Sequence, residues 1–265
     1  MKHFLTIILF CLISFKISAQ NPEIAILGAF NDEVKLLEDS LQQKQEHFIR
    51  GIRYLTGTLR GKQVVVNLTG VGKVNAAMST SLLLATWQPK YLIFTGIAGG
   101  IAEGLAPGDI VIGKQSMQHD FGRIDSTKMT IWTTRNPIAG KQNPRLFDGD
   151  AFLVALAQNV GVNVAYQFVG KKRLPKVSLG IIATGDVFVN SKEKVKNLRE
   201  NTQADAIEME GAAVAQVCYQ LGVPCLIIRS ISDNADGQAH KDLPNFEKVA
   251  AFNSASLVMA MLGKL

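Results

Sequence analysis

The 265-residue sequence has few of the features that mark metal-binding, nucleic-acid-binding or repetitive proteins. It has three cysteines, and Cys218 and Cys225 have no third ligand nearby, which argues against a metal site and favours two separate buried thiols over a disulfide. The net charge is +6, but the 28 Lys and Arg residues are scattered along the sequence and form no basic cluster that would indicate nucleic-acid binding. Internal repeats and low-complexity tracts are absent. The 47% hydrophobic content is typical of a globular protein with a full core.

The sequence also lacks an apolar run of the about 20 residues that are needed to cross a bilayer. A shorter apolar stretch, Phe4–Phe15, lies behind a positively charged N-terminus and precedes Ile17-Ser18-Ala19. This pattern predicts a secretory signal peptide over residues 1–19. We therefore expect an exported protein, in the bacterial periplasm or secreted, with no stable membrane anchor after cleavage and a single domain over residues 20–265.

Apolar runs bounded by turn residues alternate with amphipathic segments along this domain. The pattern predicts an α/β three-layer sandwich with a mixed, largely parallel central sheet. The predicted strands are Glu23–Gly28, Gln63–Leu68, Tyr91–Phe94, Asp109–Ile112, Ser178–Ala183, Ala206–Glu208 and Pro224–Ser230. The predicted helices are Asp32–Gln45, Val74–Trp87, Asp148–Val160, Lys192–Asn201, Gly211–Leu221 and Phe246–Leu262. The polar stretch Gln115–Arg145 has no clear periodicity, and we expect a loop region near the site or at an interface.

Three glycine-rich turns follow predicted strands, at Gly28-Ala29, at Thr69–Lys73 and at Thr95–Gly100. A Walker motif is excluded because Val74 follows Lys73 where that motif needs Ser or Thr, and no turn supplies Gly-x-Gly-x-x-Gly at the start of a helix. Each turn alone is explained by tight geometry. Three of them at successive strand ends favour a ligand site, because ligands bind beyond the carboxyl ends of the strands in such sheets.

Polar side chains at other strand ends support this interpretation, although each also has a structural explanation. Glu33 lies in the first turn of a predicted helix, where an acid complements the helix dipole. Arg229 could form a structural salt bridge, and Ser232 or Asp233 could cap a helix. Asp186 alone would be a turn residue and Phe188 alone a core residue.

Seven segments together carry a family resemblance. In chain order they read AILGAFNDEVKLL, TGVGKVNAA, TGIAGGI, PGDIVIG, TGDVFVN, IEMEGAAVA and IRSISDNAD. From about Ile24 to Leu265 the chain resembles the 5′-methylthioadenosine/S-adenosylhomocysteine nucleosidases of the nucleoside phosphorylase superfamily. The set is highly specific as a whole, though no single segment is, and Gln115–Arg145 is the main part that does not match.

The resemblance implies a role for each matching residue. Glu33 is the expected base that activates water, and Asp233 the expected acid at N7 of adenine. The remaining implied contacts are with the substrate. On the adenine side, Phe188 stacks on the ring and Val189 reads it through its backbone. On the ribose side, Met209 and Glu210 hold the sugar, and Gly99 lines the space for the ribose and the water. Ser232 orients Asp233, Arg229 orders the site around Glu210, and Val71 and Ile97 complete the contacts. The resemblance also implies a homodimer whose partner loop closes the alkylthio pocket, and neither a cofactor nor a metal.

The implied chemistry fits these residue types. Breaking an N-glycosidic bond needs an acid beside the purine and a base beside C1′, so Asp233 should favour its protonated form and Glu33 its ionised form. Glu210 would accept hydrogen bonds from two ribose hydroxyls. The acidic segment Asn31-Asp32-Glu33 would repel phosphate, which favours hydrolysis over phosphorolysis.

Two other functions stay open. One is a phosphate-dependent purine nucleoside phosphorylase or a hydrolase of another adenine nucleoside, and the other is a secreted, non-catalytic nucleoside-binding or storage protein. The joint presence of Glu33, Glu210 and Asp233 argues against a binder, which needs no acid and base. Two departures from the family are the signal peptide and Ile97, where the nucleosidases commonly carry a small polar residue. Glu208 points to the same side as Glu210 and is predicted as a structural partner for a cation such as Arg229.

Overall fold

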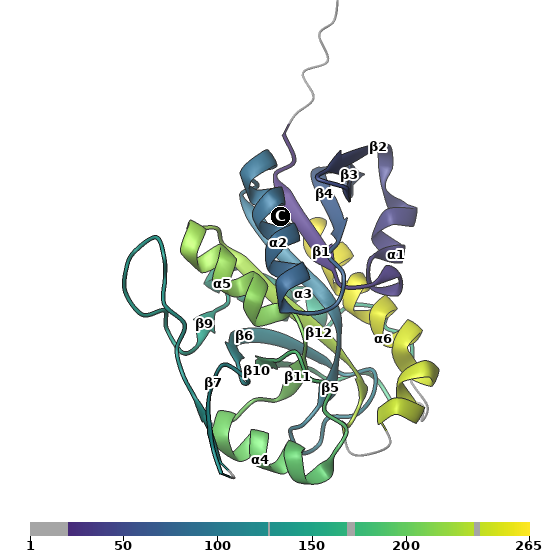
Figure 1. Cartoon of the computed structure of the whole chain (residues 1–265). Coiled ribbons are helices and arrows are strands. Elements are labelled where there is room, and N and C mark those ends of the chain that lie inside the picture. Colours follow the sequence, from purple (N-terminus) through teal and green to yellow (C-terminus); the bar gives the residue numbers. More distant parts are fainter. Residues whose placement is uncertain (1–20, 127, 169–172, 236–238) are drawn as a thin grey trace, which may run out of the picture.

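The computed structural model describes residues 21–126, 128–168, 173–235 and 239–265 (Figure 1). The predicted signal peptide, residues 1–19, lies outside the described residues. Within the described ranges, no helix combines the length and apolar character needed to cross a membrane.

A mixed sheet forms the centre of the molecule, in the strand order β11-β10-β6-β12-β5-β1-β4-β3-β2. Parallel pairs join β1 to β4 and β5, β5 to β12, and β10 to β6 and β11, whereas β12 pairs antiparallel with β6. The strand β11 also pairs antiparallel with β5, so this part of the sheet curls back on itself. The bounds are β1 (Ile24–Gly28), β2 (Gln42–Ile49), β3 (Ile52–Leu59), β4 (Lys62–Leu68), β5 (Tyr91–Gly100), β6 (Ile110–Gln118), β9 (Phe147–Asp148), β10 (Val177–Thr184), β11 (Ala206–Glu208) and β12 (Cys225–Asp233).

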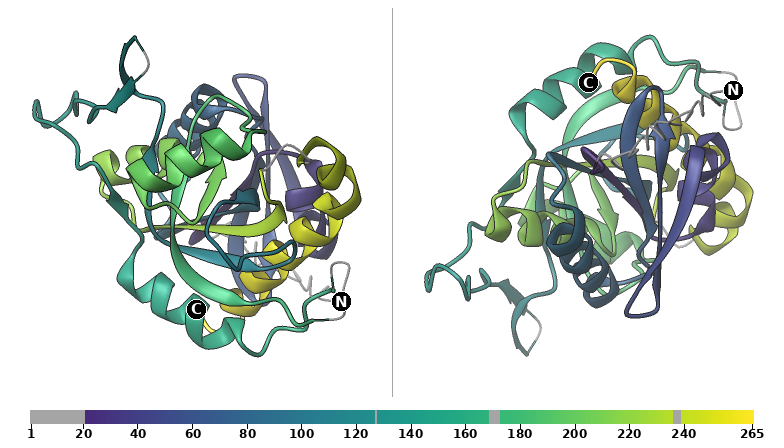
Figure 2. Two further views of the ribbon diagram at one scale, coloured as in Figure 1. Left: turned by 90° about the horizontal axis from the view of Figure 1, so that it is seen from below. Right: turned by 90° about the horizontal axis from the view of Figure 1, so that it is seen from above.

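Helices cover both sides of this sheet. Helices α2 and α5 pack against each other on one side, while α6 packs against α1 and α3 on the other (Figure 2). The bounds are α1 (Asn31–Ser40), α2 (Lys73–Trp87), α3 (Ala151–Gly161), α4 (Lys192–Thr202), α5 (Gly211–Leu221) and α6 (Ala239–Leu262). The predicted three-layer α/β sandwich is confirmed. Its central strands are continuously apolar because both of their faces are buried, as in β1, whose five residues are all buried.

The helix predicted over Asp32–Gln45 is wrong in its second part. Helix α1 ends at Ser40, and the following residues form the edge strand β2, which pairs antiparallel with β3. The turn between them has left-handed φ angles at Arg50 (52°) and Gly51 (85°), the geometry of a tight hairpin. Strand β2 is polar and mostly exposed, so it has no alternating apolar pattern that would identify a strand.

Two predicted turns also prove to be strand. The Thr95–Gly100 segment continues β5, and residues through Asp233 continue β12, with a register shift between Ile231 and Asp233. The stretch Gln115–Arg145 is only partly irregular, because its first residues end β6 and it contains the small hairpin of β7 (Gly122–Asp125) and β8 (Lys128–Ile131). This hairpin extends away from the body of the molecule (Figure 2).

The thiols of Cys218 and Cys225 are both free and buried, as predicted. Burial raises the pKa of the Cys218 thiol, and a hydrogen bond with Cys225 adds to this shift. The two residues belong to α5 and β12 and lie in the same core cluster. They therefore act as small apolar core residues.

Candidate active site

The predicted site residues other than Val189 and Arg229 meet in a cavity of about 210 Å³. Its walls come from the first turn of α1, the last residues of β5 and β12, and the segment that joins β11 to α5. A smaller cavity of about 40 Å³ adjoins it and shares Gly99, Phe188, Met209 and Asp233. The larger cavity is lined by Ala29, Phe30, Glu33, Val71, Ile97, Ala98, Gly99, Phe188, Ile207, Glu208, Met209, Glu210, Ser232 and Asp233.

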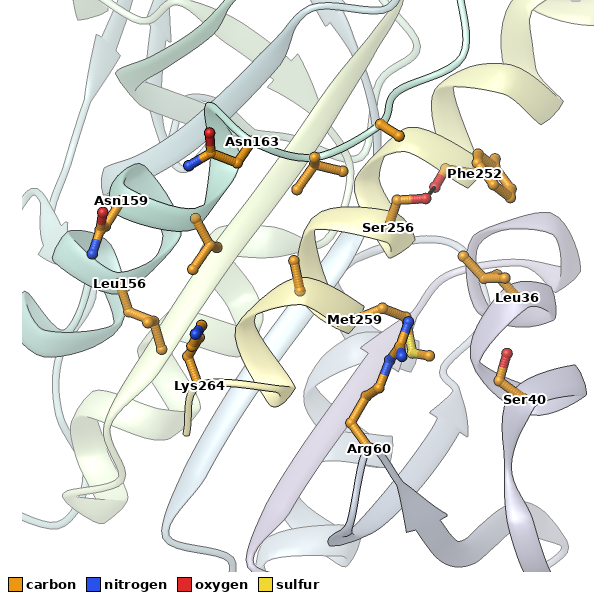
Figure 3. A pocket seen from close by; sticks show the side chains of 14 residues that line it. Leu36, Ser40, Arg60, Leu156, Asn159, Asn163, Phe252, Ser256, Met259 and Lys264 are labelled. Carbon is orange, nitrogen blue, oxygen red and sulfur yellow. Dashed lines mark hydrogen bonds between the residues drawn. The ribbon is translucent and has the colours of Figure 1, made fainter.

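A larger hollow of about 740 Å³ lies elsewhere, between α1, α3 and α6 (Figure 3). Its walls carry Arg60 and Lys264 but no Asp, Glu or His, and none of the predicted site residues. This hollow therefore offers no acid and base pair. The cavity of about 210 Å³, by contrast, brings four carboxyl groups together.

Glu33 reaches the cavity from the first turn of α1 and is 2% exposed. Its Oε1 accepts a hydrogen bond from the backbone N–H of Ile97 at 2.8 Å, and its Oε2 accepts from the N–H groups of Ala29 and Phe30. The Phe30 contact is half of a capping box at the start of the helix. The carboxylate is thus held by the ends of two neighbouring strands, β1 and β5, and not only by its own helix.

The electrostatic setting of Glu33 differs from the expected one. Burial raises the pKa of Glu33 to about 7, although Arg229 and the backbone N–H groups oppose this shift. A carboxyl group with a pKa near neutrality is half ionised there and accepts a proton readily, as a general base must. The expectation that Glu33 favours its ionised form therefore needs correction, because desolvation outweighs the effects of Arg229 and of the hydrogen bonds.

Gly96 makes room for Glu33, and the sequence analysis did not single it out. A Cβ atom at this position would lie 2.3 Å from Glu33 Oε1 and 3.1 Å from an Nη of Arg229. A side chain here would displace the carboxylate. The signal was present in the sequence as a glycine inside TGIAGG, but its partner is 63 residues away and only the fold reveals it.

Asp233 lies at the end of β12 and is 3% exposed. Its Oδ1 accepts from the N–H of Ala235 at 2.8 Å, and its Oδ2 lies 2.7 Å from the Ser232 hydroxyl. Ser232 Oγ is also 3.3 Å from the carbonyl oxygen of Ala98. Gly99 keeps the space beside Asp233 open, since a Cβ there would lie 3.2 Å from Oδ1. The predicted pairing of Ser232 with Asp233 is confirmed.

Glu210 precedes α5 and points a buried carboxyl group toward the same cavity. Its Oε1 accepts from the backbone N–H of Gly72, at the start of α2, at 2.8 Å. Burial raises the pKa of Glu210, and the nearby Glu208 carboxylate adds to this effect. Within the described residues, the other oxygen, Oε2, accepts no hydrogen bond, so it can accept one from a ligand.

Arg229 does not line the cavity, which corrects its expected place among the substrate contacts. Its side chain is fully buried and donates to Oε2 of Glu208 from Nε at 3.2 Å and from an Nη at 2.5 Å. The guanidinium also lies 4.3 Å from the centre of the Phe94 ring. Glu208 in turn accepts from Thr184 and from the N–H of Gly211. The predicted pairing of Glu208 with Arg229 is confirmed, and the pair stabilises the floor beneath Glu210.

The rest of the cavity wall is apolar. Phe188 is 51% exposed and faces both cavities, while Val189 lines only the smaller one. Met209, Ile97 and Val71 line the larger one, and Val71 is half-exposed at its edge. Side chains of this kind accept a flat base or an alkyl group, and the carboxyl groups provide the polar contacts.

The fold and the site define a class: an α/β enzyme with a small, largely apolar pocket and four buried carboxyl groups, suited to a nucleoside. The model of the phosphorylase superfamily matches residues 23–263. The 5′-methylthioadenosine/S-adenosylhomocysteine nucleosidase of Shewanella halifaxensis is 40% identical over 245 residues, which are 92% of this chain and 100% of the relative.

Solved structures agree with this match. The nucleosidase of Colwellia psychrerythraea in complex with adenine has a TM-score of 0.79 and 34% identity, over 93% of this chain and 96% of that one. The futalosine hydrolase of Helicobacter pylori has a TM-score of 0.78 and 30% identity, over 92% and 99%. The chain belongs to the phosphorylase superfamily and, within it, to the 5′-methylthioadenosine/S-adenosylhomocysteine nucleosidase family.

Proposed function

We propose that this chain hydrolyses the N-glycosidic bond of adenine thionucleosides, 5′-methylthioadenosine and S-adenosylhomocysteine, to adenine and the thioribose. The observation that carries this function is the meeting of Glu33 and Asp233, from opposite ends of the chain, on one small cavity with Glu210. Each carboxyl group has a different set of fixed partners, so the three can have different roles.

Asp233 is the acid in this mechanism. The Ser232 hydroxyl donates to Oδ2 of Asp233 at 2.7 Å and the N–H of Ala235 donates to Oδ1 at 2.8 Å, so the direction of the carboxyl group is fixed at both oxygens. In the proposed step, the carboxyl group gives a proton to N7 of adenine as the glycosidic bond breaks. Protonation turns the departing base into a neutral leaving group.

Glu33 is the base that takes a proton from the attacking water. Its pKa of about 7 matches this task near neutral pH, and its backbone hydrogen bonds fix its direction. Glu210 accepts hydrogen bonds from the ribose hydroxyls and places negative charge near the cationic sugar that develops as the bond breaks.

The charges around the cavity favour water over phosphate as the attacking group. No Lys or Arg is among the residues that line the cavity in the described parts of the chain, whereas four acidic residues are. The nearest buried cation, Arg229, is bound to Glu208. A phosphate dianion would therefore find no free cation among the lining residues to balance its charge.

The direct test is to incubate the purified chain with methylthioadenosine, S-adenosylhomocysteine, adenosine and inosine, and to follow release of the base in buffers with and without phosphate. We expect adenine and a free thioribose from the first two compounds, at the same rate in both buffers. A sugar 1-phosphate formed only with phosphate would contradict hydrolysis, and binding without base release would indicate the non-catalytic alternative.

Asp233→Asn should lower adenine release by at least about 100-fold while the fold survives, because the amide cannot supply the proton. Steady-state kinetics and circular dichroism measure the two effects. Asp39→Asn is the matched control, since Asp39 is exposed and pairs with Lys35 on α1. Turnover near that of the unmodified chain would refute the role of Asp233.

We also propose that the mature chain forms a homodimer. Val71, Val74 and Met78 lie together at the start of α2, and between 48% and 77% of each is exposed. Apolar residues gathered beside a site favour a protein contact. The same proposal has the partner subunit close the open side of the pocket, next to Val71.

Export stays a proposal that rests on the pattern of residues 1–19. The mass of the protein recovered from the periplasm or the medium of an expressing bacterium tests it. A chain that begins at Gln20 would support export, and a full-length chain in the cytoplasm would contradict it.

A further inference from the structure

The segment that carries Phe188 and Val189 is exposed, yet it must lie in one place to hold a base. Val187 is 60% exposed and Phe188 51%, and no helix or strand includes either residue. An exposed loop of this kind is mobile unless its backbone is bound elsewhere. Asp186, two residues before Phe188, makes the hydrogen bonds that hold this segment in place.

Asp186 is fixed at both its side chain and its backbone. Its Oδ1 accepts from the N–H of Lys73, the first residue of α2, at 2.8 Å, and its own N–H donates to Oδ2 of Asp120 at 2.7 Å. The N-terminus of a helix favours a carboxylate at such a position. The loop after β10 is thus connected to α2 and to the end of β6.

Lys73 completes this cluster. Its Nζ lies 2.6 Å from Oδ1 of Asp120, 3.2 Å from Oε1 of Gln118 and 3.8 Å from Oδ2 of Asp186. The pKa of Asp120 is lowered: partial burial opposes the shift, but the hydrogen bonds from Lys73 and from the Asp186 N–H outweigh it. One half-buried cation therefore balances two carboxylates.

Glycine at two positions lets these segments approach each other. A Cβ at Gly185 would lie 2.4 Å from the ring of His119 and 3.0 Å from Cγ of Asp120. At Gly72, φ is +95°, and a Cβ would lie 3.3 Å from Oδ1 of Asp186. The contact is closely packed and leaves the loop little freedom.

The same turn of α2 also holds the sugar side of the site. The N–H of Gly72 binds Glu210, and the next N–H, that of Lys73, binds Asp186. Two successive backbone donors thus set the distance between the carboxylate expected at the ribose and the loop expected at the adenine.

We propose that Lys73, Asp120 and Asp186 are positioning residues that hold the Phe188–Val189 loop against the start of α2, and that they thereby set the affinity of the site for adenine. This inference rests on the proposed function, which makes adenine the ligand. None of the three residues lines the cavity, so they act through Phe188 and Val189.

Asp186→Ala should weaken adenine binding and raise KM for methylthioadenosine by about tenfold, with kcat changed less than about threefold. Asp186→Asn keeps an oxygen that accepts from Lys73 and should stay within about threefold in KM. Calorimetry with adenine and steady-state kinetics provide these values. Asp39→Ala is the matched control, because it removes an exposed carboxylate from a lysine pair on α1, and it should change neither value.

A double-mutant cycle separates positioning from general loss of structure. In a Phe188→Ala background, Asp186→Ala should cost less than about threefold in adenine affinity, because the side chain that it positions is gone. An equal tenfold loss in both backgrounds, or a loss of kcat with unchanged adenine affinity, would overturn the proposal. The cycle needs only adenine binding, so it decides this inference even where base release from nucleosides fails and refutes the proposed function.

Discussion

At the scale of single residues, Gly96 carries no side chain at the place where the Glu33 carboxylate lies. A Cβ atom here would lie 2.3 Å from Oε1, so the carboxylate would have to leave the position in which it accepts the hydrogen bond from the Ile97 N–H. Glu33 can therefore occupy its position only because Gly96 has no side chain, although Gly96 itself carries no reactive group.

Gly96→Ala should lower kcat/KM by about 100-fold, since a catalytic group that is misplaced by about 1 Å loses activity to this extent. Hydrolysis of methylthioadenosine measures it. Gly263→Ala is the control, because a Cβ there would meet its nearest neighbour at an ordinary 3.5 Å. A Gly96→Ala chain as active as this control would show that Glu33 can function from another position.

The raised pKa of Glu33 also predicts a pH dependence of stability. The folded chain binds this proton with a pKa of about 7, against the ordinary value of 4.5, so ionisation costs the folded state stability as pH rises from about 4.5 to about 7. The full cost is about 3 kcal/mol above this range. Glu33→Gln removes the titration.

The free energy of unfolding of Glu33→Gln, relative to the unmodified chain, should therefore increase by about 3 kcal/mol between pH 4.5 and pH 8. Urea unfolding at both values measures this difference. The comparison is made within each variant, so the altered hydrogen bonds of the amide cancel. A difference that does not change with pH would show that Glu33 titrates at its ordinary value in the folded chain.

At the scale of elements, the buried Glu208–Arg229 pair joins β11 to β12. Arg229 is buried between Phe94 and Glu208, and Glu208 also binds the N–H groups at the start of α5. The pair therefore connects the segment that carries Met209 and Glu210 to the strand that ends at Asp233. Loss of one partner would leave a charge buried without compensation.

Glu208→Ala should lower the free energy of unfolding by about 3–5 kcal/mol. Asp39→Ala, which breaks an exposed pair on α1, should lower it by no more than about 0.5 kcal/mol. Urea denaturation of these two variants tests this expectation, together with that of a double variant that combines Arg229→Met and Glu208→Leu. The double variant should recover part of the loss because no unpaired charge remains. Similar losses for Glu208→Ala and Asp39→Ala would contradict it.

At the scale of the whole molecule, the side of the sheet that carries α2 is the one that exposes apolar residues beside the cavity. Val74 is 77% exposed and Met78 48%, one helical turn apart on the same face of α2. If two chains associate, this face brings a second subunit next to Val71 and the open side of the pocket.

Val74→Asp with Met78→Glu should convert a dimer to a monomer and raise KM for methylthioadenosine by at least about tenfold. Size-exclusion chromatography with light scattering and steady-state kinetics test both effects. Val162→Asp is the control, since this residue is 74% exposed but lies at the end of α3, on the other side of the sheet. An unmodified chain that elutes as an active monomer would refute the dimer.

The predicted fold class follows from local signals that survive in the structure. Continuous apolar runs such as Ile24–Gly28 identify strands that are buried on both faces, and amphipathic segments such as Gly211–Leu221 identify the helices. The polar edge strand Gln42–Ile49 was missed because its side chains face solvent and carry no apolar pattern. Its pairing with β3 depends on backbone hydrogen bonds and on a tight turn, and neither can be predicted from a pattern of apolar side chains.

The sequence by itself determined which chemical groups are available: Glu33, Glu210 and Asp233, the serine beside Asp233, and glycines at strand ends. Only the tertiary structure decided how they are paired. It brings Glu33 to the Ile97 N–H and Glu210 to the Gly72 N–H, and it commits Arg229 to Glu208 instead of to substrate. The reason is physical: residues far apart in the chain determine burial and hydrogen bonding, and these two set which carboxyl group holds a proton, which charge is neutralised and which side chain a ligand can reach.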